Sequence, residues 1–556
     1  MTAPVPREQR WARPAGGREP AAAALLGWLA DPHAPRLCVV TGSAGCGKST
    51  LLAWLVGHGT RPGTGTERRV HGFVPAAGLG VRAMAWMLAD QLGVAARTPG
   101  ELARALAADG RRTLVVLPEL HAAADLAATA AFVDLLTGVR RLRLLIEVRT
   151  GEPALPAAAD RAAVLDLDDP RWTDESRRAS WAEEHAASDE EPREDARSAP
   201  ERAGSEEPLP DLDDPVAVLG AEPYRVTTAY ETAADAHGGL REAWLRAGQA
   251  LVAGQPPAGR ALALRAALGD GADPRLAPAL DRAAADAPWR LVWSRVRGDV
   301  RPPWPGPALA LTLTGGRLLS CDHQGTVRLL DPGTAAAQGR LSAPYPGVTS
   351  VAGLPDGAVL VLDAHGRVHV DRDLVPRPTG LEALLAEDAG PAQEEAAKAL
   401  RAACEVTALA TSPSGLTAVG GGDGTVHLPA VSRSARLHEG PVTALTLCEL
   451  PPDDVPLLYS GGADGQVRAW GPGGDPLAEP VVRRRQAVTA LSAREVTGTG
   501  PVLAVAWSDG RVDHHVLDTG VLRSFRPGQP VTAVAVTPDG GMIVGTRETL
   551  VALRPV

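Results

Sequence analysis

The sequence is short of several residue types, and these shortages already carry information. Among its 556 residues there is no asparagine, and lysine occurs only at Lys48 and Lys398. Isoleucine, phenylalanine and tyrosine are also scarce. Since the codons for these residues are rich in A and T, their shortage indicates a GC-rich, bacterial genome. A lysine that is kept where arginine is otherwise used is therefore informative, and Lys48 lies in a glycine-rich motif.

The sequence also lacks the cysteine pattern of a disulfide framework, an apolar run long enough to span a membrane, and a basic stripe. The five cysteines are scattered without metal-ligand spacing, which favours reduced thiols. No apolar run reaches the roughly 20 residues that cross a bilayer, and residues 1–20 are too polar for a signal peptide. No basic stripe suggests nucleic-acid binding. We therefore expect a cytoplasmic protein that binds neither membranes nor nucleic acid.

The negative charge is concentrated in one segment. The formal net charge is −10, and thirteen acidic residues and three arginines between Glu183 and Asp214 account for all of it. Segments of low hydrophobicity and high charge cannot compensate for the entropy of ordering. The sequence therefore predicts a disordered acidic linker over 171–215, with a helix over 174–187 as an alternative for part of it. A flexible tail is predicted over 1–20.

Alternating apolar runs over residues 21–170 predict an open, mostly parallel α/β sheet. The expected strands are 36–41, 69–74, 113–117, 142–148 and a short one within 162–169. The expected helices are 20–30, 48–57, 79–92, 100–108 and 121–137. Residues 216–287 are rich in alanine and leucine at helical spacing, which predicts a small helical unit.

A repeat of short β runs fills residues 288–556. Five tight turns recur at Gly325, Gly366, Gly424, Gly465 and Gly510, at separations of 41, 58, 41 and 45 residues. A strand–turn–strand unit with a period of about 40–45 residues predicts a β-propeller. The longest interval holds a predicted helical insert over 380–403. Six strand starts are counted, so six blades are expected, with seven as the alternative; 289–298 is expected to close the ring.

The segment LCVVTGSAGCGKST contains the pattern G-x-x-x-x-G-K-[ST], formed by Gly42, Ser43, Ala44, Gly45, Cys46, Gly47, Lys48 and Ser49. A predicted strand precedes it and a predicted helix follows, which is the context of a phosphate-binding loop. Its amides and the helix N-terminus favour a phosphate. We expect Lys48 to contact the β- and γ-phosphates, Ser49 to bind Mg²⁺, and Thr50 to line the site. A glycine-rich turn without ligand is the alternative.

Residues 17–170 resemble the STAND-type ATPases, a class of P-loop NTPases that act in signal transduction. The motifs occur in the family's order: Gly-Arg-Glu at 17–19, the phosphate loop, RAMAWMLADQLGV, LRLLIEVRTGEP and VLDLDDP. The resemblance implies ATP and Mg²⁺ as cofactors, Arg18 beside the adenine, and Arg149 facing the γ-phosphate. From the residues alone, a plain helix start at 17–19 and a solvent-facing Arg149 remain alternatives.

Residues 288–556 resemble WD40-repeat propellers. Trp470 in VRAW and Asp331 in VRLLD are remnants of the family's Trp-Asp ending, and His438 matches its Gly-His position. The chain as a whole is similar to bacterial proteins in which a STAND ATPase precedes such a propeller. This resemblance implies a protein partner that binds the propeller, and it leaves open a self-association that depends on the nucleotide.

One segment departs from the ATPase pattern. After Arg112 the family has a strand that ends in Asp-Ala-Leu-Asp-Glu-Ala, whereas the matching positions 118–123 read PELHAA. The aspartate that supports magnesium has become Pro118, and the glutamate that activates water has become Ala122. Glu119 lies one position from the first and could substitute for it. Because a lost general base costs about 10²–10⁴ in rate, we expect nucleotide binding with slow or absent hydrolysis.

The sequence thus predicts an ATP-binding regulatory switch whose propeller senses or docks a partner. The alternative is a non-enzymatic scaffold, in which the α/β part is a pseudo-ATPase and the propeller mediates protein–protein interaction. The eroded segment 118–123 favours the scaffold. The complete loop 42–49 and the retained Lys48 favour the switch.

Overall fold

The computed structural model describes residues 12–151, 161–186, 208–252, 254–375 and 405–556. The predicted insert over 380–403 and parts of the predicted tail and linker (1–11 and 187–207) lie outside these ranges. Contacts divide the chain into a first unit, Met1–Leu212 with Ala221–Ala233, and a second unit, Asp213–Gly220 with Ala234–Val556. None of the helices in the described ranges combines the length and the apolar character needed to cross a membrane.

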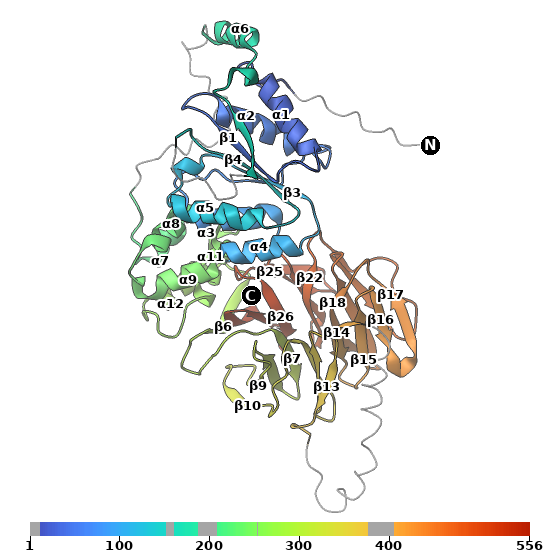
Figure 1. Ribbon diagram of the computed structural model, residues 1–556. Coiled ribbons are helices and arrows are strands. Elements are labelled where there is room, and N and C mark those ends of the chain that lie inside the picture. The colour runs from blue at the N-terminus through green and yellow to red at the C-terminus, as the bar shows by residue number, and fades with distance from the viewer. Residues whose placement is uncertain (1–11, 152–160, 187–207, 253, 376–404) are drawn as a thin grey trace, which may run out of the picture. The chain divides into compact units, whose positions relative to one another are not determined.

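The first unit is built on a five-stranded parallel sheet in the order β2-β3-β4-β1-β5. Strands β1, β3 and β4 of this sheet are labelled in Figure 1. Its strands are β1 (Leu37–Thr41), β2 (Gly72–Phe73), β3 (Thr113–Leu117), β4 (Leu142–Glu147) and β5 (Ala163–Asp166). The expected parallel α/β architecture is therefore confirmed. The order places β4 directly beside β1, while β3 is one strand further away.

Helices cover both faces of this sheet because the strands are apolar on both sides. On β1, Leu37 and Val39 belong to one core, together with residues of α3, α4 and α5. Cys38 and Val40 belong to a second core, together with residues of α1 and α2. This is the pattern of a buried parallel sheet. The helices are α1 (Glu19–Ala30), α2 (Lys48–Gly59), α3 (Val81–Leu92), α4 (Pro99–Ala108) and α5 (Leu126–Thr137).

Two elements differ from their predicted bounds by more than two residues, for local reasons. Strand β2 has two residues because the side chain of Gln91 takes over the sheet edge, accepting from Phe73 N (2.7 Å) and donating to Phe73 O (2.9 Å). Helix α5 begins at Leu126 because the Asp125 carboxylate caps it, accepting from Ala128 N at 2.9 Å. The residues before it form a separate short turn, η1 (Leu120–Ala122).

Further helices follow the sheet. They are η3 (Pro170–Trp172), α6 (Glu175–Ala186), α7 (Pro215–Gly220), α8 (Pro223–Thr232), η5 (His237–Gly239), α9 (Leu240–Ala247), α10 (Gln249–Val252), α11 (Pro257–Ala266) and α12 (Leu276–Ala283). Helix α8 packs on α3 in the first unit, where Thr228 Oγ1 accepts from Gly80 N at 3.1 Å. Helices α7 and α9–α12 belong to the second unit.

Six β-sheets form a propeller in the second unit (Figure 1). Blade 1 is β7 (Ala310–Thr314), β8 (Arg317–Cys321), β9 (Val327–Leu330) and β10 (Ala337–Arg340); the described strands of blade 2 are β11 (Val348–Gly353), β12 (Val359–Asp363) and β13 (Val368–Asp371). Blade 3 is β14 (Val406–Thr411), β15 (Thr417–Gly421), β16 (Thr425–Leu428) and β17 (Arg433–Arg436), with η7 (Pro429–Val431) between β16 and β17. Blade 4 is β18 (Val442–Leu450), β19 (Val455–Gly462), β20 (Gln466–Trp470) and β21 (Val482–Arg483).

Blade 5 is β22 (Val488–Val496), β23 (Gly500–Trp507), β24 (Val512–Val516) and β25 (Val521–Phe525). Blade 6 is β26 (Val531–Val536), β27 (Met542–Thr546), β28 (Thr549–Pro555) and β6 (Trp289–Val296). The six repeats found in the sequence each supply the first strand of one sheet. Six blades are therefore confirmed, and the seven-blade alternative is wrong.

Strand β6 closes the ring, as expected from the sequence. It pairs antiparallel with β28, from Trp289 opposite Pro555 to Val296 opposite Thr549. Trp289 Nε1 donates to Ser524 O at 3.0 Å, and Trp293 Nε1 donates to Pro332 O at 3.1 Å. Since those carbonyls belong to blades 5 and 1, the closing strand is fastened to both neighbouring blades.

The recurring turn glycines are required by close backbone approach. Gly325 and Gly465 both have positive φ, 80° and 74°. A Cβ on Gly325 would lie 1.9 Å from Tyr345 O, and one on Gly465 would lie 2.2 Å from Arg484 O. No other residue fits such a position without displacing backbone, which explains why the repeat is visible in a diverged sequence.

Candidate functional sites

The glycine loop, residues 42–47, connects β1 to α2 and is shaped by left-handed backbone. Gly45 and Gly47 have φ of 76° and 92°, and Gly47 caps α2 without a side-chain hydrogen bond. The first amides of α2 therefore meet no capping side chain at this end of the helix. Ser43, Ala44 and Gly45 are exposed, so the outer surface of the loop is open to solvent.

Lys48 lies inside the curve of the glycine loop. Its side chain is buried, and Nζ donates to Gly42 O at 2.9 Å and to Ser43 O at 2.8 Å. A lysine ammonium carries three donors and no acceptor. The two carbonyls thus hold the positive charge of Lys48 against the backbone of the glycine loop.

Glu147 contributes a carboxylate to the same place, which the sequence did not reveal. It is the last residue of β4, it is 2% exposed, and it lies opposite Val40 of β1. The hydroxyl of Ser49 donates to it, with Oγ 3.1 Å from Oε1 and 3.3 Å from Oε2. Burial raises the pKa of Glu147, and the charge of Glu119 also raises it, while the hydrogen bond from Ser49 and the charge of Lys48 lower it.

The segment after β3 approaches Glu147 through its backbone. Pro118 is buried, and Glu119 is half-buried with a left-handed φ of 57°. The backbone N–H of Glu119 donates to the Glu147 carboxylate. Ala122 is exposed. Among the described contacts, Ser49 therefore meets the carboxylate at the end of β4 rather than that of Glu119.

Arg18 lies against the backbone of the glycine loop. Its guanidinium donates to Cys46 O, to Leu167 O (3.0 Å) and to Thr173 Oγ1 (2.7 Å). Burial lowers the pKa of Arg18. The side chain therefore ties the loop to the segment that follows β5.

A second residue that the sequence did not reveal, Asp168, also holds the loop. Its Oδ2 accepts from Ser43 N at 2.7 Å, and its Oδ1 accepts from Ser43 Oγ at 2.8 Å. Its signal in the sequence was the acidic run LDLDD, which begins within β5 and continues past its end. Two other predicted residues, Thr50 in the first turn of α2 and Arg149 just after β4, are exposed.

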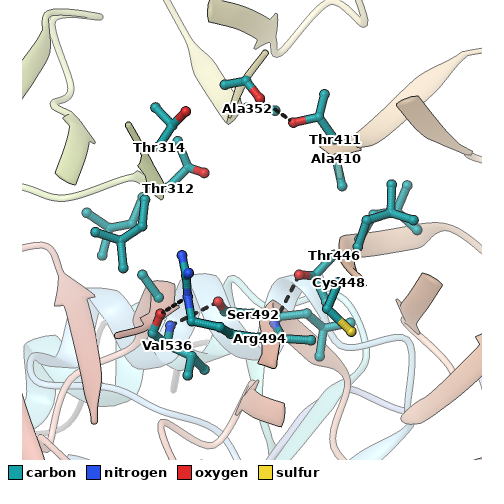
Figure 2. A pocket seen from close by; sticks show the side chains of 18 of the residues that line it. Thr312, Thr314, Ala352, Ala410, Thr411, Thr446, Cys448, Ser492, Arg494 and Val536 are labelled. Atoms are coloured by element: carbon teal, nitrogen blue, oxygen red, sulfur yellow. Dashed lines mark hydrogen bonds between the residues drawn. The ribbon is translucent and has the colours of Figure 1, made fainter. Parts of the chain in front are cut away.

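The propeller contains the second candidate site, a central cavity of about 970 Å³ lined by the inner strands of all six blades (Figure 2). Hydroxyl groups on its wall link neighbouring blades. Thr411 Oγ1 donates to Gly353 O at 2.7 Å, and Thr446 Oγ1 accepts from Ala493 N at 3.0 Å. Arg494 reaches along the wall, where Nε donates to Val536 O at 3.1 Å and burial lowers its pKa.

Blade 4 contains two of the residues that carry the resemblance to WD40 repeats, His438 and Trp470. His438 is buried, with Nδ1 3.1 Å from Asp464 Oδ1 and Nε2 2.9 Å from Ser460 Oγ. Trp470 is buried in the adjoining core. These side chains hold the blade together and do not line the central cavity.

The chain is therefore a two-unit protein, with a glycine loop at the end of a parallel sheet and a six-bladed β-propeller. A scan against models of protein families gives no match, and a search among curated proteins gives none either.

Proposed function

We propose that the first unit binds ATP with Mg²⁺ at the glycine loop and hydrolyses it slowly or not at all. The conformation of residues 42–49 is the observation that carries this proposal. Left-handed glycines, a helix start without a capping side chain and a buried lysine, between a parallel strand and a helix, support an anion site here. The preference for ATP comes from the resemblance to STAND ATPases.

Slow turnover is supported by the segment after β3. Pro118 has no carboxylate to support a metal, and Ala122 has none to activate water. Loss of a general base lowers a rate by about 10²–10⁴. ATP would then stay bound for a long time, and the function would depend on which nucleotide is bound rather than on the energy of hydrolysis.

The propeller is the natural partner-binding part of this switch. Propellers present many loops on a rigid ring, and such loops commonly bind other proteins. A nucleotide biases a conformational equilibrium only if it binds one state better than the other. The proposal therefore includes two states with different affinities for ATP and ADP.

Titration of a fluorescent ATP analogue into the full chain tests the nucleotide site. We expect binding that Lys48→Ala weakens at least about tenfold, because a desolvated charge-assisted contact contributes about 1.5–3 kcal/mol. Lys398→Ala, which changes the only other lysine, is the matched control. Absence of binding by the parent would overturn the proposal, and fast Lys48-dependent phosphate release would overturn its slow-turnover part.

A non-enzymatic scaffold is the second candidate, favoured by the residues at 118 and 122. It is separated from the switch by comparing the ATP-bound and ADP-bound chain. The switch predicts different oligomeric states, or different rates of proteolysis within residues 170–215, for the two nucleotides. Identical behaviour with ATP and ADP would leave the scaffold as the better description.

A further inference from the structure

The carboxylate of Glu147 is placed as a metal ligand rather than as an ordinary buried acid. It stands at the carboxyl end of β4, which pairs directly with the strand that leads into the glycine loop. In open α/β sheets, ligands bind at this end of the strands. Its two oxygens both face the hydroxyl of Ser49, at 3.1 and 3.3 Å.

The charge of Glu147 is only partly compensated by the protein. An ionised carboxylate is costly to bury unless it is paired or coordinates a metal. Within the described residues, Glu147 forms no ion pair. The charge of Lys48 acts on it, but Lys48 donates its hydrogen bonds to two carbonyls. The groups that do contact it are neutral donors, the Ser49 hydroxyl and the Glu119 backbone.

The donor set suits magnesium. A serine hydroxyl and a carboxylate are hard oxygen ligands, and Mg²⁺ is typically held by one or two protein carboxylates together with substrate phosphates and water. The described residues contain no cluster of three or more His, Cys, Asp or Glu side chains that could hold a metal by itself. The phosphates of a bound nucleotide would have to complete the coordination.

We propose that Glu147 supplies the carboxylate that holds Mg²⁺ beside Ser49, in the role that residues 118–123 no longer fill. The inference rests on the proposed nucleotide site and adds the metal ligand to it. Glu119 does not bind the metal in this proposal. Its backbone N–H donates to the Glu147 carboxylate and so orients it. The carboxylate that holds the metal would thus lie at the end of β4 instead of at the end of the neighbouring strand, β3.

A purely structural role makes a different prediction. If Glu147 only anchors the Ser49 hydroxyl, its loss would affect the loop equally with and without metal. If Glu147 holds the metal, its loss would affect only the metal-dependent part of binding. The ratio of nucleotide affinities with and without metal therefore separates the two roles.

The test uses the full chain, fluorescent ATP and Mn²⁺ as a spectroscopic substitute for Mg²⁺. Affinity is measured with Mn²⁺ and with a chelator, and bound Mn²⁺ is counted by electron paramagnetic resonance. We expect Glu147→Gln to reduce the enhancement by metal about tenfold or more, with unchanged affinity in chelator. Glu67→Gln, which changes an exposed glutamate of the same unit outside the site, is the matched control and should leave the enhancement intact.

Three other outcomes would contradict the proposed role of Glu147. Binding by the parent with equal metal enhancement in Glu147→Gln would overturn this inference alone. Failure of the parent to bind nucleotide under either condition would overturn the proposed function as well. If Glu147→Gln unfolds, Glu147→Asp retains the charge but withdraws the oxygens by one methylene, and an undiminished metal enhancement in that variant would also contradict the inference.

Discussion

At the scale of single residues, the fold brings together side chains whose relation is hidden in the sequence. Ser49 and Glu147 are 98 positions apart, and the glutamate lies in the apolar run RLLIEV. The serine was predictable because its spacing from the glycines and Lys48 is local. The glutamate has no local pattern, because its partner depends on which strand lies beside β1. The one indication in the sequence was that an acidic residue occurs in a strand that should be buried on both faces.

Introducing acids after β3 should increase hydrolysis if the first unit binds ATP as proposed. Ala122→Glu, with or without Pro118→Asp, is expected to raise phosphate release at saturating ATP at least about tenfold, because a positioned general base contributes about 10²–10⁴. Ala122 is exposed, so a longer side chain has room. Ala124→Glu adds the same charge in the same exposed segment and is the control. An unchanged rate would show that other parts of the hydrolytic machinery are missing, in favour of the scaffold.

His514 should make the stability of the propeller depend on pH. It is 1% exposed, and burial lowers its pKa to about 4, with Arg523 and His515 acting in the same direction. The unfolded chain binds a proton below about pH 6.5, whereas the folded chain does so only near pH 4. Stability is therefore lost as the pH falls through this window, by up to about 1.4 kcal/mol per pH unit.

Thermal unfolding from pH 7 to pH 4 measures this effect. His514→Gln retains a hydrogen-bond donor for Gly540 O but cannot titrate, so the melting temperature of the variant should depend less steeply on pH. His515 and His438, whose pKa values are also lowered by burial, remain in both proteins. Equal slopes in the two proteins would mean that His514 does not titrate differently on folding.

At the scale of elements, α1 and the glycine loop are connected through Arg18. If this arginine braces the loop, Arg18→Ala should destabilise the first unit by about 2 kcal/mol even without nucleotide, because buried groups lose a charged hydrogen-bond partner. If it contacts only the adenine, the stability of the nucleotide-free protein should not change. Melting curves without nucleotide decide between the two roles, and Arg13→Ala, an exposed arginine of the same segment, is the control.

Most elements of both units could be predicted, and the exceptions have identifiable causes. Runs of alternating strand and helix character are local, so β1, β3 and β4 appear at their expected positions. Strand β2 was predicted too long, because apolar residues near Phe73 suggested a strand where the side chain of Gln91 ends the sheet. The residues that hold the glycine loop, Asp168 among them, come from distant loops, and only the assembled sheet shows them.

At the scale of the whole molecule, ring closure should dominate the stability of the propeller. Trp289 is 1% exposed on β6, so Trp289→Ala is expected to cost about 3–5 kcal/mol through the lost contacts and the cavity left behind. Val292 lies on the same strand but is 46% exposed, and Val292→Ala should be close to neutral. Chemical denaturation of both variants provides the comparison. A cost for Trp289→Ala no larger than that for Val292→Ala would contradict a structural role for the closing strand.

The six-bladed architecture could be counted in advance because each blade begins with a similar run, and five of the six have a glycine at the same turn. The sequence could not show that hydroxyls of the inner strands would bridge neighbouring blades. Such bridges join residues of different repeats, for example Thr411 with Gly353, and they follow from the packing of one blade on the next.

The pairing of β6 with β28 also has a consequence for how the protein is made. During synthesis Trp289 leaves the ribosome more than two hundred and fifty residues before Pro555, its partner across the last sheet. The first unit and the early blades can fold while β6 has no neighbour, but the ring stays open. Completion of the propeller therefore waits for the final strand, and until then the exposed edge of β6 is a place where a chaperone would act or where two growing chains could pair wrongly.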